Sequence, residues 1–126
     1  MKVAISVSEN HLSSPVELQF ERAAYYIIFE LNGSAQTTSK IVHNPNATSM
    51  NDNGILTAQL LINLGIDVLL TGWCDPNALR VFQKAKIPIY KLVPGFAQDI
   101  IDAYKENKYK LDELTDLGQD DLSTSF

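Results

Sequence analysis

Residues 64–92 constrain the fold most strongly, because they predict a strand, a tight loop, a helix and a second strand in succession. The run Ile66–Leu70 is apolar except for Asp67, which is typical of a short strand covered on both faces. Asp75 followed by Pro76 predicts a helix start, with the aspartate as N-cap and the proline at the first helical position. A strand–helix–strand unit of this length predicts two parallel strands joined by a right-handed crossover.

The loop between this strand and this helix, Gly72–Asn77, is the first candidate for a binding site. Open α/β sheets bind ligands at the carboxyl ends of their strands, which is where this loop is expected. The loop also carries the only Trp and the only Cys of the chain, Trp73 and Cys74. The backbone N–H groups at the helix start form a generic anion site, although Asp75, as the cap, would occupy part of it.

The remaining sequence predicts a mixed sheet. Asn32-Gly33 is the pattern of a two-residue hairpin turn, and it separates two runs that favour strands. Pro88 cannot donate a hydrogen bond to a neighbouring strand, so the last strand is expected at a sheet edge. Residues 44–53 are rich in Asn and predict a mobile loop. The expected strands are Val3–Val7, Ala23–Leu31, Ala35–His43, Ile66–Thr71 and Ile87–Leu92, and the expected helices begin at Gly54, Pro76 and Phe96.

Length and charge limit the function classes. A chain of 126 residues suffices for one domain with one core. We expect an α/β domain over residues 1–115 and an acidic, flexible tail over residues 116–126. The formal net charge of -5, without a basic cluster, argues against nucleic-acid binding. No apolar run approaches the ~20 residues that span a bilayer, and the amino terminus does not resemble a signal peptide, so we expect no membrane partner and a cytoplasmic location.

The sequence contains little that indicates catalysis. It lacks the Gly-x-Ser-x-Gly pattern, the phosphate-binding Gly-x-x-x-x-Gly-Lys pattern and paired carboxylates on strand ends. Hydrolysis with two metal ions needs acids on the central strands, where the chain has Ser6 and, at the amino-terminal end of its strand, Asp67. One cysteine excludes both an intrachain disulfide and a zinc site built on several thiolates. We therefore expect a protein that is not an enzyme.

Cys74 allows two interpretations, and so do the charged residues of the first loop. A thiol just before a helix N-terminus has a lowered pKa, which favours a soft metal, a cluster or reaction with oxidants. A lone cysteine without a basic neighbour is more often buried and inert. His11 is expected either exposed in its loop or close to Cys74. Arg22 is expected to hold an anionic ligand or to form a surface ion pair with Glu17 or Glu21.

Two sequence motifs resemble signatures of the dinitrogenase iron–molybdenum cofactor biosynthesis family, whose members are nitrogenase accessory proteins. The first motif is Ser14-Pro15-Val16 followed by Phe20-x-Arg22-Ala23. The second is Thr71-Gly72-x-x-x-Pro76-Asn77-Ala78-x-Arg80-Val81, preceded by Leu64-Gly65-Ile66-Asp67-Val68. The order of the motifs and the succession of strands and helices are similar to the family over residues 1–115.

The resemblance implies both a fold and a function. The implied fold is a three-layer α/β fold of the ribonuclease H-like type, with a five-stranded mixed sheet of order 3-2-1-4-5 in which strand 2 is antiparallel. Because strands 1 and 4 are then neighbours, the first loop would lie beside Gly72–Asn77. The implied function is that of a small carrier of an iron–molybdenum or iron–sulfur cluster, although many members are stand-alone domains without a defined role.

The first motif departs from the family pattern at two positions. Family members commonly have His-Phe-Gly-Arg where this chain has Gln19-Phe20-Glu21-Arg22. A neutral amide thus replaces a good ligand for a soft metal, and a carboxylate, which repels an anionic cluster, replaces glycine. Cys74 would be the only soft ligand left, whereas clusters normally use several thiolates. We therefore expect the fold to be retained more faithfully than the cofactor.

The leading hypothesis is a non-enzymatic binding or carrier domain for a metallocluster or a small anionic ligand, with a protein of metal-cofactor assembly as a further partner. The first alternative is a cofactor-free protein-interaction or regulatory module of the same fold. The second is a redox sensor that uses Cys74. The cofactor-binding residues expected from the two motifs and their loops are Ser14, Gln19, Phe20, Arg22, Gly72, Cys74 and Asn77, with Cys74 as the metal ligand.

Overall fold

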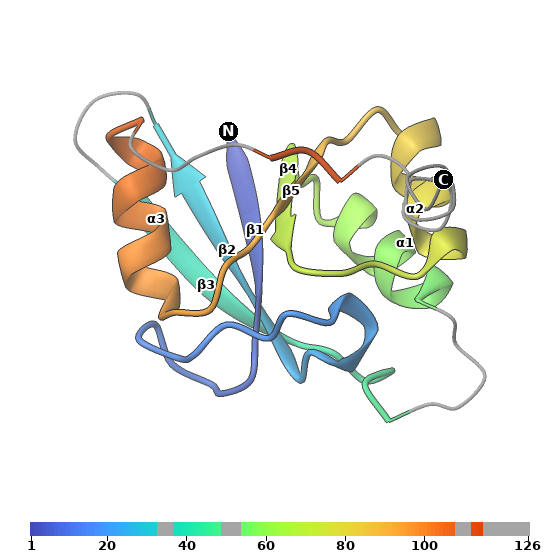
Figure 1. Ribbon diagram of the computed structural model, residues 1–126, viewed down its shortest axis with the longest axis horizontal. Coiled ribbons are helices and arrows are strands. Elements are labelled where there is room, and N and C mark those ends of the chain that lie inside the picture. The colour runs from blue at the N-terminus through green and yellow to red at the C-terminus, as the bar shows by residue number, and fades with distance from the viewer. Residues whose placement is uncertain (33–36, 49–53, 108–111, 115–126) are drawn as a thin grey trace, which may run out of the picture.

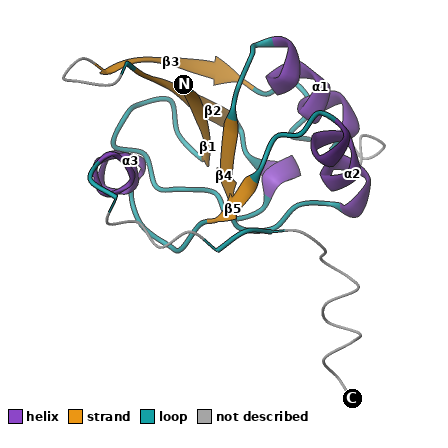
Figure 2. Cartoon of the chain, turned by 90° about the horizontal axis from the view of Figure 1, so that it is seen from above, coloured by secondary structure: helices purple, strands orange, loops and turns teal. Residues whose placement is uncertain are grey.

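The protein is a three-layer α/β domain, seen here in a computed structural model that describes residues 1–32, 37–48, 54–107 and 112–114. One sheet of five strands lies between helix α3 on one face and helices α1 and α2 on the other (Figures 1 and 2). The strands are β1 (Lys2–Val7), β2 (Tyr25–Leu31), β3 (Thr37–His43), β4 (Val68–Thr71) and β5 (Ile89–Lys91), and the α-helices are α1 (Ile55–Asn63), α2 (Pro76–Lys84) and α3 (Ala97–Lys105).

The sheet has the order and the strand directions that the resemblance implies. The order is β3-β2-β1-β4-β5. Strand β2 is antiparallel to both β1 and β3, whereas β4 is parallel to β1 and to β5. The loops that follow β1, β4 and β5 therefore leave the sheet at one edge, which we call the carboxyl edge. The opposite edge, where β1 and β4 begin, is the amino edge.

The central strand β1 is buried on both faces. Val3, Ile5 and Val7 pack in the core beneath α3, whereas Ala4 packs in the core beneath α1 and α2. This alternation follows from the two-residue period of a strand. All of these side chains are fully buried, so β1 fixes the position of the loop that follows it.

The start of α2 agrees with the pattern in the sequence. The Asp75 carboxylate accepts a hydrogen bond from the backbone N–H of Asn77, 3.2 Å away, and Pro76 occupies the first turn. The predicted N-cap is therefore confirmed, and the helix begins directly after the loop that follows β4.

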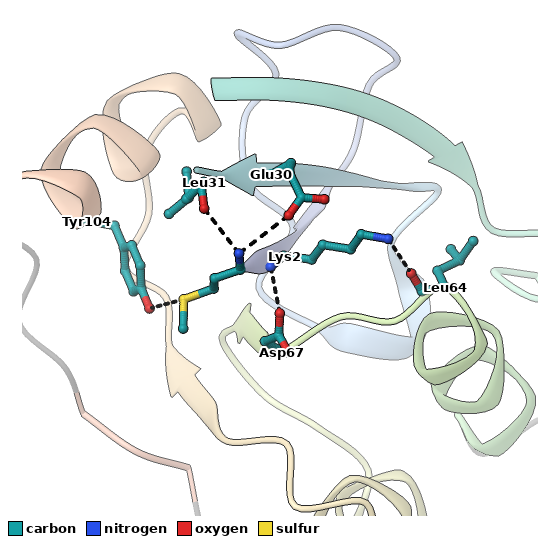
Figure 3. Close-up of polar contacts among 7 residues, drawn as sticks. Lys2, Glu30, Leu31, Leu64, Asp67 and Tyr104 are labelled. Carbon is teal, nitrogen blue, oxygen red and sulfur yellow. Dashed lines mark hydrogen bonds and ion pairs between the residues drawn. The ribbon is translucent and has the colours of Figure 1, made fainter. Parts of the chain in front are cut away.

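At the amino edge, charged groups bind the backbone (Figure 3). The backbone N–H of Lys2 donates to the Asp67 carboxylate over 2.8 Å, and the Lys2 ammonium donates to the Leu64 carbonyl over 3.2 Å. The second contact places a cation at the carboxyl end of α1, where the helix dipole favours it. The α-amino group lies 3.4 Å from the Glu30 carboxylate. These contacts join the start of β1 to β2, to α1 and to the entry of β4.

One predicted connection is wrong, and the start of another is anchored to the core. Leu31 pairs with Thr37, so residues 32–36 connect β2 to β3, and the two-residue turn predicted at Asn32-Gly33 is wrong. Residues 33–36 themselves lie outside the described residues. The loop predicted as mobile begins at Asn44, which is buried, donates to the Ala23 carbonyl over 2.9 Å and accepts from the Thr57 hydroxyl over 3.1 Å. The start of this loop is thus anchored to the core, and residues 49–53 lie outside the described residues.

Strand β5 is the last strand of the sheet, as predicted, but residues 112–114 cover its outer edge. Lys91 donates its backbone N–H to the Asp112 carbonyl over 2.8 Å, and Leu114 donates to the Ile89 carbonyl over 2.7 Å. The segment runs antiparallel to β5 and therefore heads toward the amino edge. The predicted acidic tail, residues 116–126, lies outside the described residues. Within the described chain, no helix combines the length and the hydrophobicity that crossing a bilayer requires.

Candidate functional site at the carboxyl edge

The loop after β1 lies between the other two loops of the carboxyl edge. On one side, Val16 donates its backbone N–H to the Gly95 carbonyl, and Ala97 donates to the Ser14 carbonyl, each over 2.9 Å. These bonds join the first loop to the loop that follows β5. We use the name carboxyl rim for the three segments together: residues 8–22, 72–77 and 92–97.

On its other side, the first loop pairs with the loop that follows β4. Trp73 donates its backbone N–H to the Leu18 carbonyl over 2.6 Å, and Phe20 donates to the Trp73 carbonyl over 2.8 Å. Gln19 and Trp73 form a parallel bridge at this point. The two loops that sequence analysis placed side by side are therefore hydrogen-bonded to each other, and Ser14 and Cys74 belong to loops of the same edge.

Gly72 permits this pairing. A Cβ atom at Gly72 would lie 2.6 Å from the Leu18 carbonyl oxygen and 2.7 Å from the Leu18 Cβ, closer than nonbonded atoms approach. The backbone of the first loop thus occupies the space that a side chain would need. Gly72 is therefore required for contact between the loops, and binding of a ligand at this glycine stays a prediction.

Two buried hydroxyls support the rim from below. The Ser6 and Thr71 hydroxyl oxygens, at the carboxyl ends of β1 and β4, lie 2.9 Å apart. The Ser6 hydroxyl also donates to the Glu17 carbonyl over 2.6 Å. These hydroxyls are already engaged with each other and with the backbone, so they tie the first loop to the two central strands.

Cys74 is a core residue. Its side chain is fully buried, in the same core cluster as Phe20, Ala78 and Phe82. Burial raises the pKa of the Cys74 thiol far above its usual value, and the nearby carboxylates of Glu21 and Asp75 raise it further. The expectation of a pKa lowered by the helix dipole is therefore wrong, because desolvation outweighs the dipole. The structure thus confirms the interpretation of Cys74 as a buried, packed residue, and its inertness stays a prediction.

The side chains around Gln19 are engaged with one another. The Gln19 amide donates to Glu21 Oε2 over 3.3 Å, and its backbone N–H donates to Glu17 Oε2 over 3.2 Å. Glu21 Oε1 accepts from the backbone N–H of Asp75 over 3.4 Å. Burial raises the pKa of Glu21, and the charge of Asp75 adds to this shift, although its hydrogen bonds oppose it. A small acidic network therefore lies next to Trp73.

Three other residues expected to bind a cofactor make contacts within the protein. The Ser14 hydroxyl is buried, accepts from the Glu9 backbone N–H over 2.9 Å and donates to the Pro15 carbonyl over 2.8 Å. Phe20 is fully buried, with its ring edge-on to that of Phe82 at a centroid distance of 5.5 Å. Asn77 Oδ1 accepts from the Arg80 guanidinium over 2.8 Å.

Arg22 and His11 are the two basic residues of the first loop. Arg22 is exposed, and it makes neither of the predicted ion pairs with Glu17 or Glu21 within the part of the chain that the structure describes. His11 is exposed and lies 2.6 Å from the Glu9 carboxylate, so the interpretation as an exposed loop histidine is confirmed. Among the described residues, no three His, Cys, Asp or Glu side chains gather in a way that could hold a metal ion.

The apolar character of the rim is not among the features predicted from the sequence. Seven large hydrophobic side chains are exposed within the described residues, and five of them lie on the rim, whereas the other two are Met1 and Leu56. The five are Leu12 (39% exposed), Leu18 (37%), Trp73 (42%), Val93 (58%) and Phe96 (52%). Apolar residues inside loops that follow parallel strands were the signal in the sequence that could have revealed this surface.

The family model described as "Dinitrogenase iron-molybdenum cofactor" matches residues 1–107 of the sequence. The chain belongs to this family. One relative is an uncharacterized protein of Methanocaldococcus jannaschii, MJ0580. It is 26% identical to this chain over 108 residues, which cover 86% of this chain and 88% of the relative.

Solved structures show the same fold. The NMR structure of a putative NifB protein from Thermotoga has a TM-score of 0.75 and 31% identity, and the match covers 90% of this chain and 93% of that one. The apo form of the orange protein from Desulfovibrio gigas has a TM-score of 0.76 and 24% identity over 88% of this chain and 92% of that one. The predicted family and fold class are therefore confirmed, and the protein is a domain of the dinitrogenase iron–molybdenum cofactor family.

The residues of this family member do not suit a cluster held by thiolate. The only thiol, Cys74, is buried and has a raised pKa, so it stays protonated at neutral pH. The amide of Gln19 is bonded to the carboxylate of Glu21. The rim segments carry Glu9, Glu17, Glu21 and Asp75 against the single guanidinium of Arg22, and this excess of negative charge repels an anionic cluster.

Proposed function

We propose that this domain is a non-enzymatic accessory module that binds another protein through the carboxyl rim. The observation that carries the proposal is the concentration of exposed apolar side chains, Trp73 and Phe96 among them, on loops that hydrogen bonds hold together. Removing apolar surface from water is favourable by about 25 cal/mol per Å². Exposed apolar patches rimmed by polar groups mark sites of protein interaction.

The side chains that would carry chemistry at this edge have other roles. The Cys74 thiol is buried and protonated, and the Ser6 and Thr71 hydroxyls are bonded to each other. His11, the histidine of the first loop, lies beside Glu9 and is exposed. These contacts support a binding role over a nucleophilic or redox role for the rim.

Membership of the family favours a second candidate function, in which the domain carries the iron–molybdenum cofactor or a precursor as cargo. The cargo would then rest on the rim without a thiolate ligand. Arg22, exposed and without an ion pair among the described residues, would supply the positive charge.

The experiment that separates the two functions starts with protein purified without oxygen from its native source. A partner that co-purifies is identified by mass spectrometry and is then offered to the wild type and to Trp73→Ala, Leu56→Ala and Cys74→Ala variants. Leu56 is the matched control, because it is 55% exposed but lies on α1, outside the three segments of the rim. We expect the partner to be lost from Trp73→Ala and retained by Leu56→Ala and Cys74→Ala, provided that circular dichroism shows each variant folded.

The carrier function is tested in parallel by anaerobic reconstitution with iron and sulfide, followed by absorbance and iron counting. We expect no stoichiometric iron in the wild type. Stoichiometric iron that disappears in Cys74→Ala would contradict the proposed protein-binding function and restore the cysteine as a ligand.

A further inference from the structure

We infer that the carboxyl rim receives a basic, amphipathic segment of a partner protein, in which an Arg or Lys side chain lies against the face of Trp73 while neighbouring apolar side chains cover Leu18 and Phe96. This inference rests on the proposed function and names the chemistry of the partner. It rests on the exposure of Trp73 and on the negative charges of the two loops that hold it. It also rests on the poor fit of two other candidate occupants, a second copy of the chain and the chain's own carboxyl-terminal residues.

Trp73 is an exposed ring on a rigid base. Its backbone N–H and carbonyl are both bonded to the first loop, at Leu18 and Phe20, and Phe20 is fully buried. The residue nevertheless remains 42% exposed. Because the backbone at Trp73 is already ordered, binding there costs little further backbone entropy, and tryptophan is among the residues enriched at the energetic centres of interfaces.

Three carboxylates lie in the two loops that hold Trp73, and hydrogen bonds link two of them to its neighbours Gln19 and Asp75. Gln19, which bridges to Trp73, is bonded to both Glu17 and Glu21, and Glu21 in turn accepts from the backbone of Asp75. An exposed tryptophan on loops that carry several carboxylates favours a cation, because the ring quadrupole and the negative charge of the loops both attract it. Complementary charge also steers the encounter and selects among partners.

A second copy of this chain fits the rim poorly. Two rims brought face to face would each carry Glu17, Glu21 and Asp75, so like charges would meet. The whole chain also has a formal net charge of -5, which opposes self-association.

The carboxyl-terminal residues of the same chain fit poorly as well. Residues 112–114 run antiparallel to β5 and head toward the amino edge, away from the rim. The sequence beyond them contains Asp116, Asp120 and Asp121 and no Lys or Arg. The acidic sequence of these residues therefore favours a different, basic chain as the occupant.

The test uses Trp73 as its own reporter, because it is the only Trp in the chain. Two synthetic peptides of equal length serve as probes, one of alternating Arg and Leu and one of alternating Glu and Leu. Each is titrated into the full chain at low and at high salt while the Trp73 emission is recorded. We expect the Arg–Leu peptide to shift the emission, with an affinity that falls as salt rises, and the Glu–Leu peptide to leave it unchanged.

A charge variant supplies the control. Combined Glu17→Gln, Glu21→Gln and Asp75→Asn substitutions keep the acceptor oxygens of the network and remove its charge, so we expect the Arg–Leu peptide to bind roughly tenfold more weakly. Glu30→Gln removes one charge at the amino edge and is expected to leave the affinity unchanged (Figure 3).

The inference is overturned if both peptides bind equally well, if neither binds, or if the triple substitution has no more effect than Glu30→Gln. Each of these results leaves the proposed function to be judged separately, by whether the Trp73→Ala variant still retains the co-purified partner. Loss of that partner together with equal binding of the two peptides would mean that the rim is an interface of purely apolar character.

Discussion

The amino edge and the carboxyl edge of the sheet carry different kinds of side chain. At the amino edge, charged groups of Lys2, Asp67 and the α-amino terminus bind backbone or carboxylate partners across elements (Figure 3). At the carboxyl edge, Trp73 and Phe96 are exposed above a backbone that is already satisfied. The contrast indicates that the amino edge contributes to stability, whereas the exposed apolar groups of the carboxyl edge are free to contribute to binding.

The largest effect is expected for Phe20→Ala, which tests whether the rim rests on the core. Phe20 is fully buried against Tyr26 and Phe82, so its truncation should lower the free energy of unfolding by about 3–5 kcal/mol. Urea unfolding followed by circular dichroism measures this loss. A loss below about 1 kcal/mol would contradict the assignment of Phe20 to the core rather than to a ligand site.

Gly72→Ala is expected to have the next largest effect, because its Cβ would lie 2.6 Å from the Leu18 carbonyl oxygen. Relief of this clash must separate the two loops, at a cost of about 1–3 kcal/mol in the free energy of unfolding. Amide hydrogen exchange should show faster exchange of the Trp73 N–H, which donates to that same carbonyl. Unchanged exchange at Trp73 would show that the loops do not depend on each other.

Asp67→Ala tests the amino edge alone. The substitution removes the acceptor of the Lys2 backbone N–H, and we expect a loss of about 1 kcal/mol because the site is exposed to solvent. Thermal and urea unfolding measure the loss, and Asp67→Asn, which keeps an acceptor oxygen, serves as the control. Binding at the rim should be unaffected, so a variant with normal stability and impaired binding would reverse the proposed roles of the two edges.

The smallest effect is expected for Glu21→Gln and depends on pH. Burial, followed by the charge of Asp75, raises the pKa of Glu21 above its usual 4.5. The folded state then binds the proton more tightly than the unfolded state, so the contribution of Glu21 to stability is fully present below pH 4.5 and declines as pH rises through the folded-state pKa. Glutamine should therefore stabilise the protein at neutral pH by a few tenths of a kcal/mol, a small gain because the group is partly exposed to solvent.

The comparison that checks this prediction is urea unfolding of both proteins at neutral pH and below pH 4.5. The difference in stability should disappear in acid. A difference that persists at the lower pH would show that it arises from packing rather than from the charge.

Local patterns explain why the fold could be predicted from the sequence. Asp75-Pro76 marks a helix start by chemistry that involves only neighbouring residues, and the apolar run before it marks a buried strand. The two motifs of the family added the strand order, which the structure confirms. The turn at Asn32-Gly33 was mispredicted because the pairing of Leu31 with Thr37, and not the dipeptide, sets the length of the connection.

The candidate site was harder to predict because it depends on contacts between distant segments. The hydrogen bond from Trp73 to Leu18, and the bridge to Gln19, join residues more than fifty positions apart. For Cys74, the helix dipole can be inferred from the sequence and would lower the pKa of the thiol. Full burial cannot be inferred from the sequence, and its effect, which raises this pKa, outweighs the dipole. The exposure of Leu18 and Phe96 likewise follows only from the packing of the three loops.

The most direct test of the account is calorimetric measurement of the dissociation constant of the co-purified partner for the wild type, Trp73→Ala and Asp67→Ala. We expect Trp73→Ala to weaken binding by tenfold or more, which corresponds to about 1.4 kcal/mol, while the unfolding free energy of this variant stays within about 0.5 kcal/mol of the wild type. Asp67→Ala should leave the affinity unchanged and lower the unfolding free energy by about 1 kcal/mol. Unchanged affinity for folded Trp73→Ala would contradict the claim that the carboxyl rim is the binding surface.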